Sequence, residues 1–127
     1  MVREERHNRR DLRYSKWHRD NLPNYCYATD LDWIEWRPDK GIVAFVETKI
    51  GWDTPITSFQ EKVFAELEEK SGVPVFVVNH TEKLDQFKVS RRGRVLRLDE
   101  VEFIEFMKQL GEQEEPLERF TSMAEVI

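Results

Sequence analysis

Apolar residues occur along the chain in short runs and at helical spacings, and the two patterns alternate. Residues 3–19 hold many helix formers and few breakers, which predicts an N-terminal helix. Residues 25–36 are rich in aromatic and branched side chains, a composition typical of a strand. Residues 42–49 are apolar on both faces as far as Glu47, so they predict a central strand that forms a hairpin with the first.

A second helix is predicted from a capping pattern at residues 57–61 to Gly72, with Phe59, Val63 and Leu67 at four-residue spacing. The apolar run 73–78 follows at once and is typical of a buried strand. A helix between two strands indicates a crossover, so this strand should run parallel to the strand of Glu47 or its neighbour.

Two further elements complete the predicted fold. Residues 87–89 and 94–98 flank a basic turn and predict a hairpin with an exposed tip. Asp99, with Glu102 three residues later, should cap a last helix. The core-facing stripe of that helix, which should end at Gly111, is Phe103, Phe106, Met107 and Leu110.

These elements fit one domain, which is the size that 127 residues favour. We expect an α/β fold, with a central mixed sheet of about four or five strands flanked by helices, over residues 1–111. Residues 112–127 should form an acidic tail that is mobile or docks on a partner.

Charge is distributed unevenly. Residues 99–127 hold nine acidic and two basic residues, a net charge of −7, and the whole chain carries −5, so residues 1–98 carry +2. Two basic clusters could therefore contact phosphates, although such clusters also serve simply as solvated faces. The candidate nucleic-acid contacts are Lys16, His18, Arg19, Arg91 and Arg92. His18 has the alternative of being an ordinary surface histidine.

Nothing in the sequence suggests a membrane or an oxidising compartment. No apolar run approaches the length of about 20 residues that a membrane span needs, and the N-terminus lacks the apolar stretch of a secretory signal. The single cysteine, Cys26, cannot form an internal disulfide. We expect a cytoplasmic protein with no membrane partner.

Candidate chemistry lies on the first hairpin. Alternation along a strand would place Asp30 and Asp32 on one face, and Glu47 and Lys49 on one face of the next strand. If these faces coincide, three carboxylates and an amine meet. Buried acids of one sign repel each other, and a hard divalent cation with oxygen ligands relieves that repulsion.

Five features follow one another in a fixed order along the chain. They are an aspartate, a hairpin turn, an apolar strand ending Val46-Glu47-Thr48-Lys49, a helix carrying Gln60 and a buried strand. Over residues 15–80 this resembles the PD-(D/E)xK superfamily, which includes restriction endonucleases, Holliday-junction resolvases and related repair nucleases. Leu31 stands where many members have proline. The acidic residue that many members carry on the first helix has Glu4 and Glu5 as candidates.

The resemblance implies a restriction-endonuclease-like fold and a metal-dependent nuclease that hydrolyses DNA or, as the less favoured substrate, RNA. It implies that Asp32, Glu47 and the Thr48 backbone carbonyl bind Mg²⁺ or Mn²⁺, with Asp30 as a further or alternative ligand. Lys49 would orient or activate the attacking water, and Gln60 would face the site. These roles suit phosphodiester hydrolysis, which needs an activated water and cancellation of charge on the phosphoryl oxygens.

Other interpretations remain open at this point. Glu47 and Lys49 could form a structural ion pair without metal, and the chain could be a non-catalytic nucleic-acid-binding or assembly module of the same fold. His80, at the end of a predicted strand, is a weaker site candidate. Nucleases of this size often dimerise, so a homodimer is expected. Core or interface positions are predicted for Trp33 and Trp36, and the tail could add to an interface through Leu117, Phe120, Met123, Val126 and Ile127.

Overall fold

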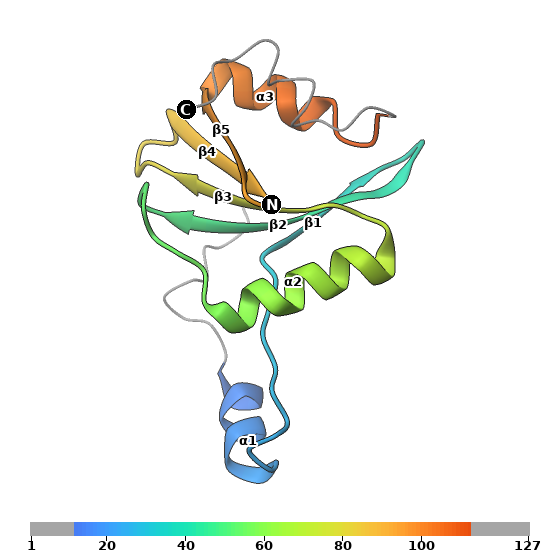
Figure 1. Cartoon of the computed structure of the whole chain (residues 1–127), viewed down its shortest axis with the longest axis vertical. Coiled ribbons are helices and arrows are strands. Elements are labelled where there is room, and N and C mark those ends of the chain that lie inside the picture. Colours follow the sequence, from blue (N-terminus) through green and yellow to red (C-terminus); the bar gives the residue numbers. More distant parts are fainter. Residues whose placement is uncertain (1–11, 113–127) are drawn as a thin grey trace, which may run out of the picture.

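The computed structural model describes residues 12–112 as an α/β fold with five strands and three helices (Figure 1). The elements in chain order are α1 (Arg13–Asn21), β1 (Trp33–Arg37), β2 (Gly41–Ile50), α2 (Ser58–Ser71), β3 (Val75–His80), β4 (Gln86–Arg91), β5 (Arg94–Asp99) and α3 (Glu100–Lys108). The α/β class with a mixed sheet flanked by helices, expected from the sequence, is therefore confirmed.

The five strands form one sheet in the order β1-β2-β3-β4-β5. β2 and β3 are parallel, joined by the crossover through α2, and the other three pairs are antiparallel. This confirms the predicted hairpins and the predicted parallel pair. It also places β2 between β1 and β3, so the strand that carries Glu47 is paired on both edges.

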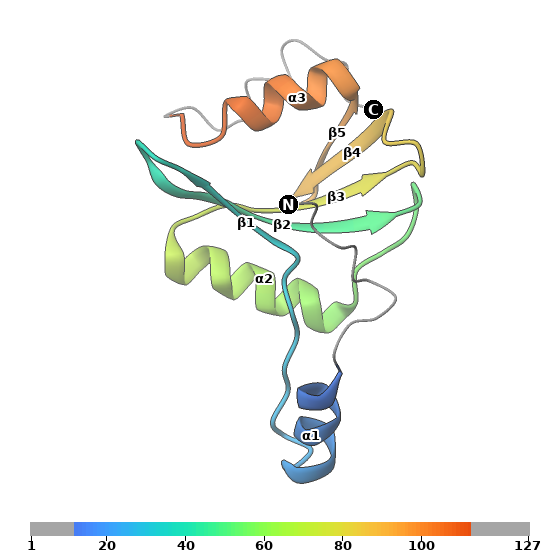
Figure 2. The same ribbon diagram turned by 180° about the vertical axis from the view of Figure 1, so that it is seen from behind.

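Helices cover both faces of the sheet (Figures 1 and 2). α3 packs on the larger core, where Phe106 meets Phe76 edge to face at 5.3 Å between ring centroids. α2 packs on the opposite face through Phe64, which contacts Phe45 and Val75. Both helices begin with the predicted type of cap, a box between Thr57 and Gln60 in α2 and between Asp99 and Glu102 in α3.

α1 lies beyond α2, at the far end of the molecule from the sheet (Figures 1 and 2). It contains no buried residue, and Tyr14 and Trp17 stack on each other while remaining 70% and 51% exposed. The N-terminal helix predicted over residues 3–19 is thus present from Arg13. Its earlier part lies outside the described residues, as do Glu4 and Glu5.

The first strand is shorter than its composition predicted. Residues 25–32 are not part of the sheet, and β1 begins only at Trp33, which pairs with Val46. Just before this pair, the Asp32 side chain accepts a hydrogen bond from the backbone N–H of Thr48, which a longer strand would have paired with its own backbone. At Asp32, a hydrogen bond to the side chain therefore replaces the backbone hydrogen bond that would continue the pairing of β1 with β2.

The buried face of α2 is shifted by one residue from the predicted stripe. The buried side chains are Gln60, Phe64 and Glu68, while Phe59, Val63 and Leu67 are half-buried beside them. A helix can bury a polar residue at each end of such a face only when each has partners, and both do. Those partners define the sites described below.

The acidic tail predicted for residues 112–127, with its apolar residues, lies outside the described residues except for Glu112. Within residues 12–112, no helix is long and apolar enough to cross a membrane.

Candidate functional site

Asp32 sits where β1 separates from β2. Its Oδ2 accepts hydrogen bonds from the Thr48 backbone N–H at 2.9 Å and from the Thr48 hydroxyl at 3.0 Å. The N–H and C=O of one strand residue point to the same edge, so the Thr48 carbonyl also lies on the β1 side of β2. The two short bonds fix the Asp32 carboxylate beside the middle of β2.

Glu47 is the buried acid of this group, with 3% of its surface exposed. Its Oε1 accepts a bond of 3.3 Å from the backbone N–H of Asp32, and its Oε2 accepts one of 3.3 Å from the Gln60 side-chain amide. Lys49 Nζ lies 3.4 Å from the same Oε2. Residues from β2, α2 and the segment before β1 therefore converge on one carboxylate.

Burial raises the pKa of Glu47 above its usual value, and the nearby Asp32 carboxylate raises it further. Lys49 opposes these effects, because its ammonium favours the charged form, but it does not cancel them. The ionised site is therefore short of positive charge, which is the condition that a divalent cation relieves.

Gln60 has two roles at the N-terminus of α2. Its Oε1 accepts a bond of 3.2 Å from the Thr57 backbone N–H to close the capping box, while its Nε2 donates to Glu47. A single amide thus caps the helix and binds the buried acid. The helix start is thereby held in a fixed position relative to β2.

Of the predicted catalytic residues, Asp32, Glu47, Lys49 and Gln60 are brought together. The oxygen donors of Asp32, Glu47 and the Thr48 carbonyl are of the kind that Mg²⁺ and Mn²⁺ prefer, so these residues fit such an ion. The expected convergence of three carboxylates is wrong. Among residues 12–112, no group of three or more His, Cys, Asp or Glu side chains is arranged to hold a metal.

Asp30 accounts for that difference. Its predicted place beside Asp32 depended on a strand that included both residues, but Asp30 lies in the irregular, exposed segment before β1. Strand alternation therefore does not place the two side chains on the same face. Asp32 is the acid that the fold joins to Glu47.

The predicted nucleic-acid contacts are not gathered around the site. Lys16 and Arg19 both lie close to Asp20 on α1, at 2.7 Å and 3.6 Å, and the His18 ring packs edge-on against Tyr14. His80 also lies away from the site, because its ring packs against Phe87 on the α3 face of the sheet.

The turn between β4 and β5 was predicted to be an exposed basic tip, and this is wrong for Arg91. Arg91 Nε lies 2.8 Å from Glu68 Oε1 with only 15% of its side chain exposed, whereas Arg92 is 67% exposed and pairs with Glu68 Oε2. Glu68 also accepts a bond from the Val75 backbone N–H at 2.8 Å. A buried acid on α2 thus draws the hairpin back onto the helix.

Sequence reasoning missed Glu68 and Asn79. The buried Asn79 donates to the carbonyls of Gly51 and Thr54 at 2.9 and 2.7 Å, which fixes the loop between β2 and α2. A polar residue directly after the apolar run 75–78 was the available signal for Asn79. The sequence signal for Glu68 was weaker: it lies four residues after Phe64 and eight after Gln60, which places all three on one face of the helix.

No family model, curated protein or solved structure matches the chain.

Proposed function

We propose that this protein is a metal-dependent nuclease of the PD-(D/E)xK superfamily that hydrolyses phosphodiester bonds, with DNA favoured over RNA. The observation that supports it most is the convergence of Asp32, Glu47 and Lys49 where β1 leaves β2. The order of strand, hairpin, crossover helix and parallel strand around them adds support, since it matches the order of the motif.

Each side chain has a role in this proposal. Asp32 and Glu47, with the Thr48 carbonyl, would hold Mg²⁺ or Mn²⁺, which supplies Lewis-acid activation of water and of the phosphoryl group. Lys49 orients the attacking water and offsets negative charge on the phosphoryl oxygens. Gln60 positions Glu47 through its 3.3 Å hydrogen bond and touches no substrate.

A cleavage assay tests the proposal. The full-length protein is incubated with plasmid, single-stranded and branched DNA and with RNA, with Mg²⁺, with Mn²⁺ and with EDTA. We expect cleavage that requires the metal and falls by at least about 100-fold in Lys49→Ala, the loss typical of removing one group that stabilises transition-state charge. Lys108→Ala is the matched control, because Lys108 lies on α3 with 66% of its side chain exposed.

The same experiment separates the alternatives. Equal nucleic-acid binding by wild type and Lys49→Ala, with no cleavage by either, would favour a non-catalytic binding module of this fold. A third outcome is that the protein neither binds nor cleaves nucleic acid and that Mn²⁺ gives the same calorimetric signal with wild type and with Glu47→Gln. Glu47 and Lys49 would then form a structural ion pair only.

We also propose that the protein acts as a homodimer in the cytoplasm. Support for a dimer comes from the edge strand β1, where Trp33, Ile34 and Trp36 are 50%, 59% and 59% exposed. Apolar side chains gathered on an exposed edge are typical of an interface. The predicted core position of the two tryptophans is therefore wrong, and their interface role stays a proposal.

A further inference from the structure

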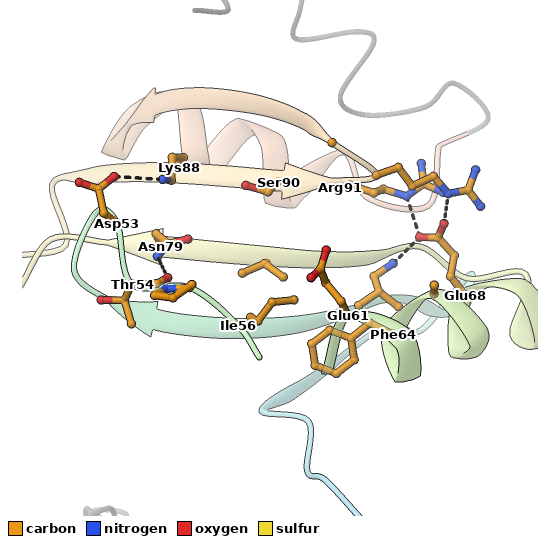
Figure 3. Close-up of a pocket in the computed structure, with 16 residues that line it drawn as sticks. Asp53, Thr54, Ile56, Glu61, Phe64, Glu68, Asn79, Lys88, Ser90 and Arg91 are labelled. Atoms are coloured by element: carbon orange, nitrogen blue, oxygen red, sulfur yellow. Dashed lines mark hydrogen bonds and ion pairs between the residues drawn. The ribbon is translucent and has the colours of Figure 1, made fainter. Parts of the chain in front are cut away.

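A cavity of about 500 Å³ lies between α2, the loop before it, and the face of β3 and β4 (Figure 3). Its volume is within the range of about 300–1,000 Å³ that small-molecule sites occupy. None of the four residues of the candidate site lines it, so it is a separate feature that the nuclease proposal does not use.

Ion pairs stand at both ends of this cavity and apolar side chains between them (Figure 3). Lys88 and Asp53, 3.7 Å apart, mark one end, and the Glu68 pairs with Arg91 and Arg92 mark the other. The apolar lining consists of Pro55, Ile56, Phe64, Ala65, Val75 and Val77. An occupant would therefore have an apolar body and charge or polarity at its ends.

The lining also holds two polar side chains that face the cavity. Glu61 extends from α2 toward the middle of the cavity, and Ser90 faces it from β4 (Figure 3). Within residues 12–112 neither side chain makes a hydrogen bond or an ion pair. Small-molecule sites are mostly apolar and orient their ligand through a few convergent polar groups. The carboxylate of Glu61 and the hydroxyl of Ser90 are groups of this kind.

The cavity adjoins the candidate site directly. Val77 and Asn79, which line the cavity, are the β3 partners of Glu47 and Lys49 in the parallel ladder. Neighbouring strands are about 4.8 Å apart, so a group bound in the cavity lies about one strand spacing from the proposed catalytic side chains. On α2, Glu61 follows Gln60 directly. The two sites thus share α2 and lie on neighbouring strands of the sheet.

We infer that this cavity receives the base and sugar of one unpaired nucleotide next to the phosphate that the Glu47 and Lys49 site attacks. The inference rests on the proposed nuclease function. A nucleobase supplies the flat apolar body and an edge with hydrogen-bonding groups, and Lys88 and Arg92 supply positive charge for the neighbouring phosphates. A base paired in a duplex cannot enter, so the substrate class is nucleic acid with single-stranded or unpaired nucleotides.

Glu61 makes the inference more specific. A carboxylate accepts hydrogen bonds from exocyclic amines, as an acidic side chain does from cytosine N4. Thymine and uracil carry a carbonyl oxygen at that position, which a carboxylate repels. Cytosine should therefore bind in the cavity better than thymine, and Glu61→Gln, whose amide can also donate, should remove most of this preference.

Nucleotide binding tests the inference without any cleavage. The full-length protein in EDTA is titrated with dCMP and with TMP, and the backbone amide signals are followed by NMR. We expect shifts at Ile56, Val77 and Ser90, with dCMP binding about tenfold more tightly than TMP. Ala65→Trp, which fills the cavity from an exposed helix position, should abolish these shifts. Glu69→Trp, on the same helix but outside the lining, is the matched control.

Each outcome bears on one proposal. If dCMP causes no shift at these three residues, or shifts them equally in Ala65→Trp, the cavity is not a nucleotide site, even when the protein cleaves DNA. Glu61→Gln changes one exposed side chain, so it provides a test of the inference even if Ala65→Trp does not fold. An unchanged ratio of dCMP to TMP affinity in Glu61→Gln would contradict the base assignment. If the protein binds nucleotides but shows no metal-dependent cleavage, the proposed nuclease function is wrong, and the assignment of the cavity as a nucleotide-binding site stands.

Discussion

The side-chain amide of Gln60 donates a hydrogen bond to Glu47, with 3.3 Å between Nε2 and Oε2, across the gap between α2 and β2. The same amide accepts from the Thr57 backbone N–H. The buried carboxylate is thus positioned by the residue that also caps the helix, which links the stability of α2 to the geometry of the candidate site.

Gln60→Glu should therefore destabilise the protein more than its small change in shape suggests. The new carboxylate can still close the capping box, but it faces Glu47 with no hydrogen to donate. A lost partner at a buried charged group costs about 2 kcal/mol. Urea unfolding at pH 7 measures this, with Gln86→Glu on the exposed part of β4 as the control. Equal stability of the two variants would show that the Gln60 contact is not made.

Asp32 allows structural and metal-binding roles to be separated. Asp32→Asn keeps one oxygen that can accept from Thr48, so unfolding free energy should change by less than about 1 kcal/mol. Asp32→Ala removes the acceptor and should cost about 1 kcal/mol or more. Calorimetry should find Mn²⁺ affinity lost in both variants, because both lack the charge. Full Mn²⁺ affinity in Asp32→Asn would rule this carboxylate out as a ligand.

Much of this fold could be predicted because its signals are local. The β1–β2 hairpin, the two capping boxes and the buried run before Asn79 each depend on residues close together in sequence. The position of Asp30 could not be predicted, because the composition of residues 25–36 suits a strand while the hydrogen bonds of Asp32 end the ladder at Trp33. Here tertiary hydrogen bonding overrides the strand propensity of the local sequence.

The contacts missing from the sequence analysis join distant segments. Glu68 meets Arg91 from 23 residues away, and Asn79 binds the carbonyl of Thr54 from 25 residues away. No periodicity encodes which charged residue a helix will bury, because that depends on which hairpin folds over it. The same limit explains why the cavity beside Val77 has no counterpart in the sequence pattern.

Divalent cations should stabilise the folded protein. Burial and the neighbouring Asp32 raise the pKa of Glu47, so the ionised pair opposes folding at neutral pH, and an ion that binds it only in the folded state relieves this. At 100 times its dissociation constant the ion should add about 2.7 kcal/mol. Thermal unfolding with Mn²⁺ and with EDTA measures the shift in Tm. Glu47→Gln should show no shift, and an equal shift in that variant would place the ion elsewhere.

Glu68 predicts a dependence of stability on pH that is separate from the candidate metal site. Burial by itself would raise its pKa, but hydrogen bonds from Arg91 and the Val75 N–H, with the charges of Arg91 and Arg92, hold the pKa below its usual value. An acid whose pKa is lower when folded stabilises above its unfolded pKa, and that contribution is lost as the pH falls. Glu68→Gln should therefore cost about 3 kcal/mol at pH 7 and progressively less in acid.

Urea unfolding of wild type and Glu68→Gln from pH 7 to pH 3 checks this prediction. The difference between them should shrink as the pH falls through the range in which glutamates titrate. Glu69→Gln, one residue along α2 and exposed, should track the wild type throughout. A constant difference between wild type and Glu68→Gln would mean that the ion pairs add no stability beyond the shape of the side chain.

The exposed edge of β1 gives the last prediction. If two copies pair through this edge, the exposed Ile34 of each copy lies in the interface, and Ile34→Lys would bury two ammonium groups in apolar surroundings. The variant should therefore be monomeric at concentrations where the wild type is dimeric, as measured by sedimentation velocity. Val101→Lys is the control, since Val101 is 71% exposed on α3, far along the sheet from β1. A wild type that stays monomeric at all concentrations, or a dimer that Ile34→Lys leaves intact, excludes this edge as the interface.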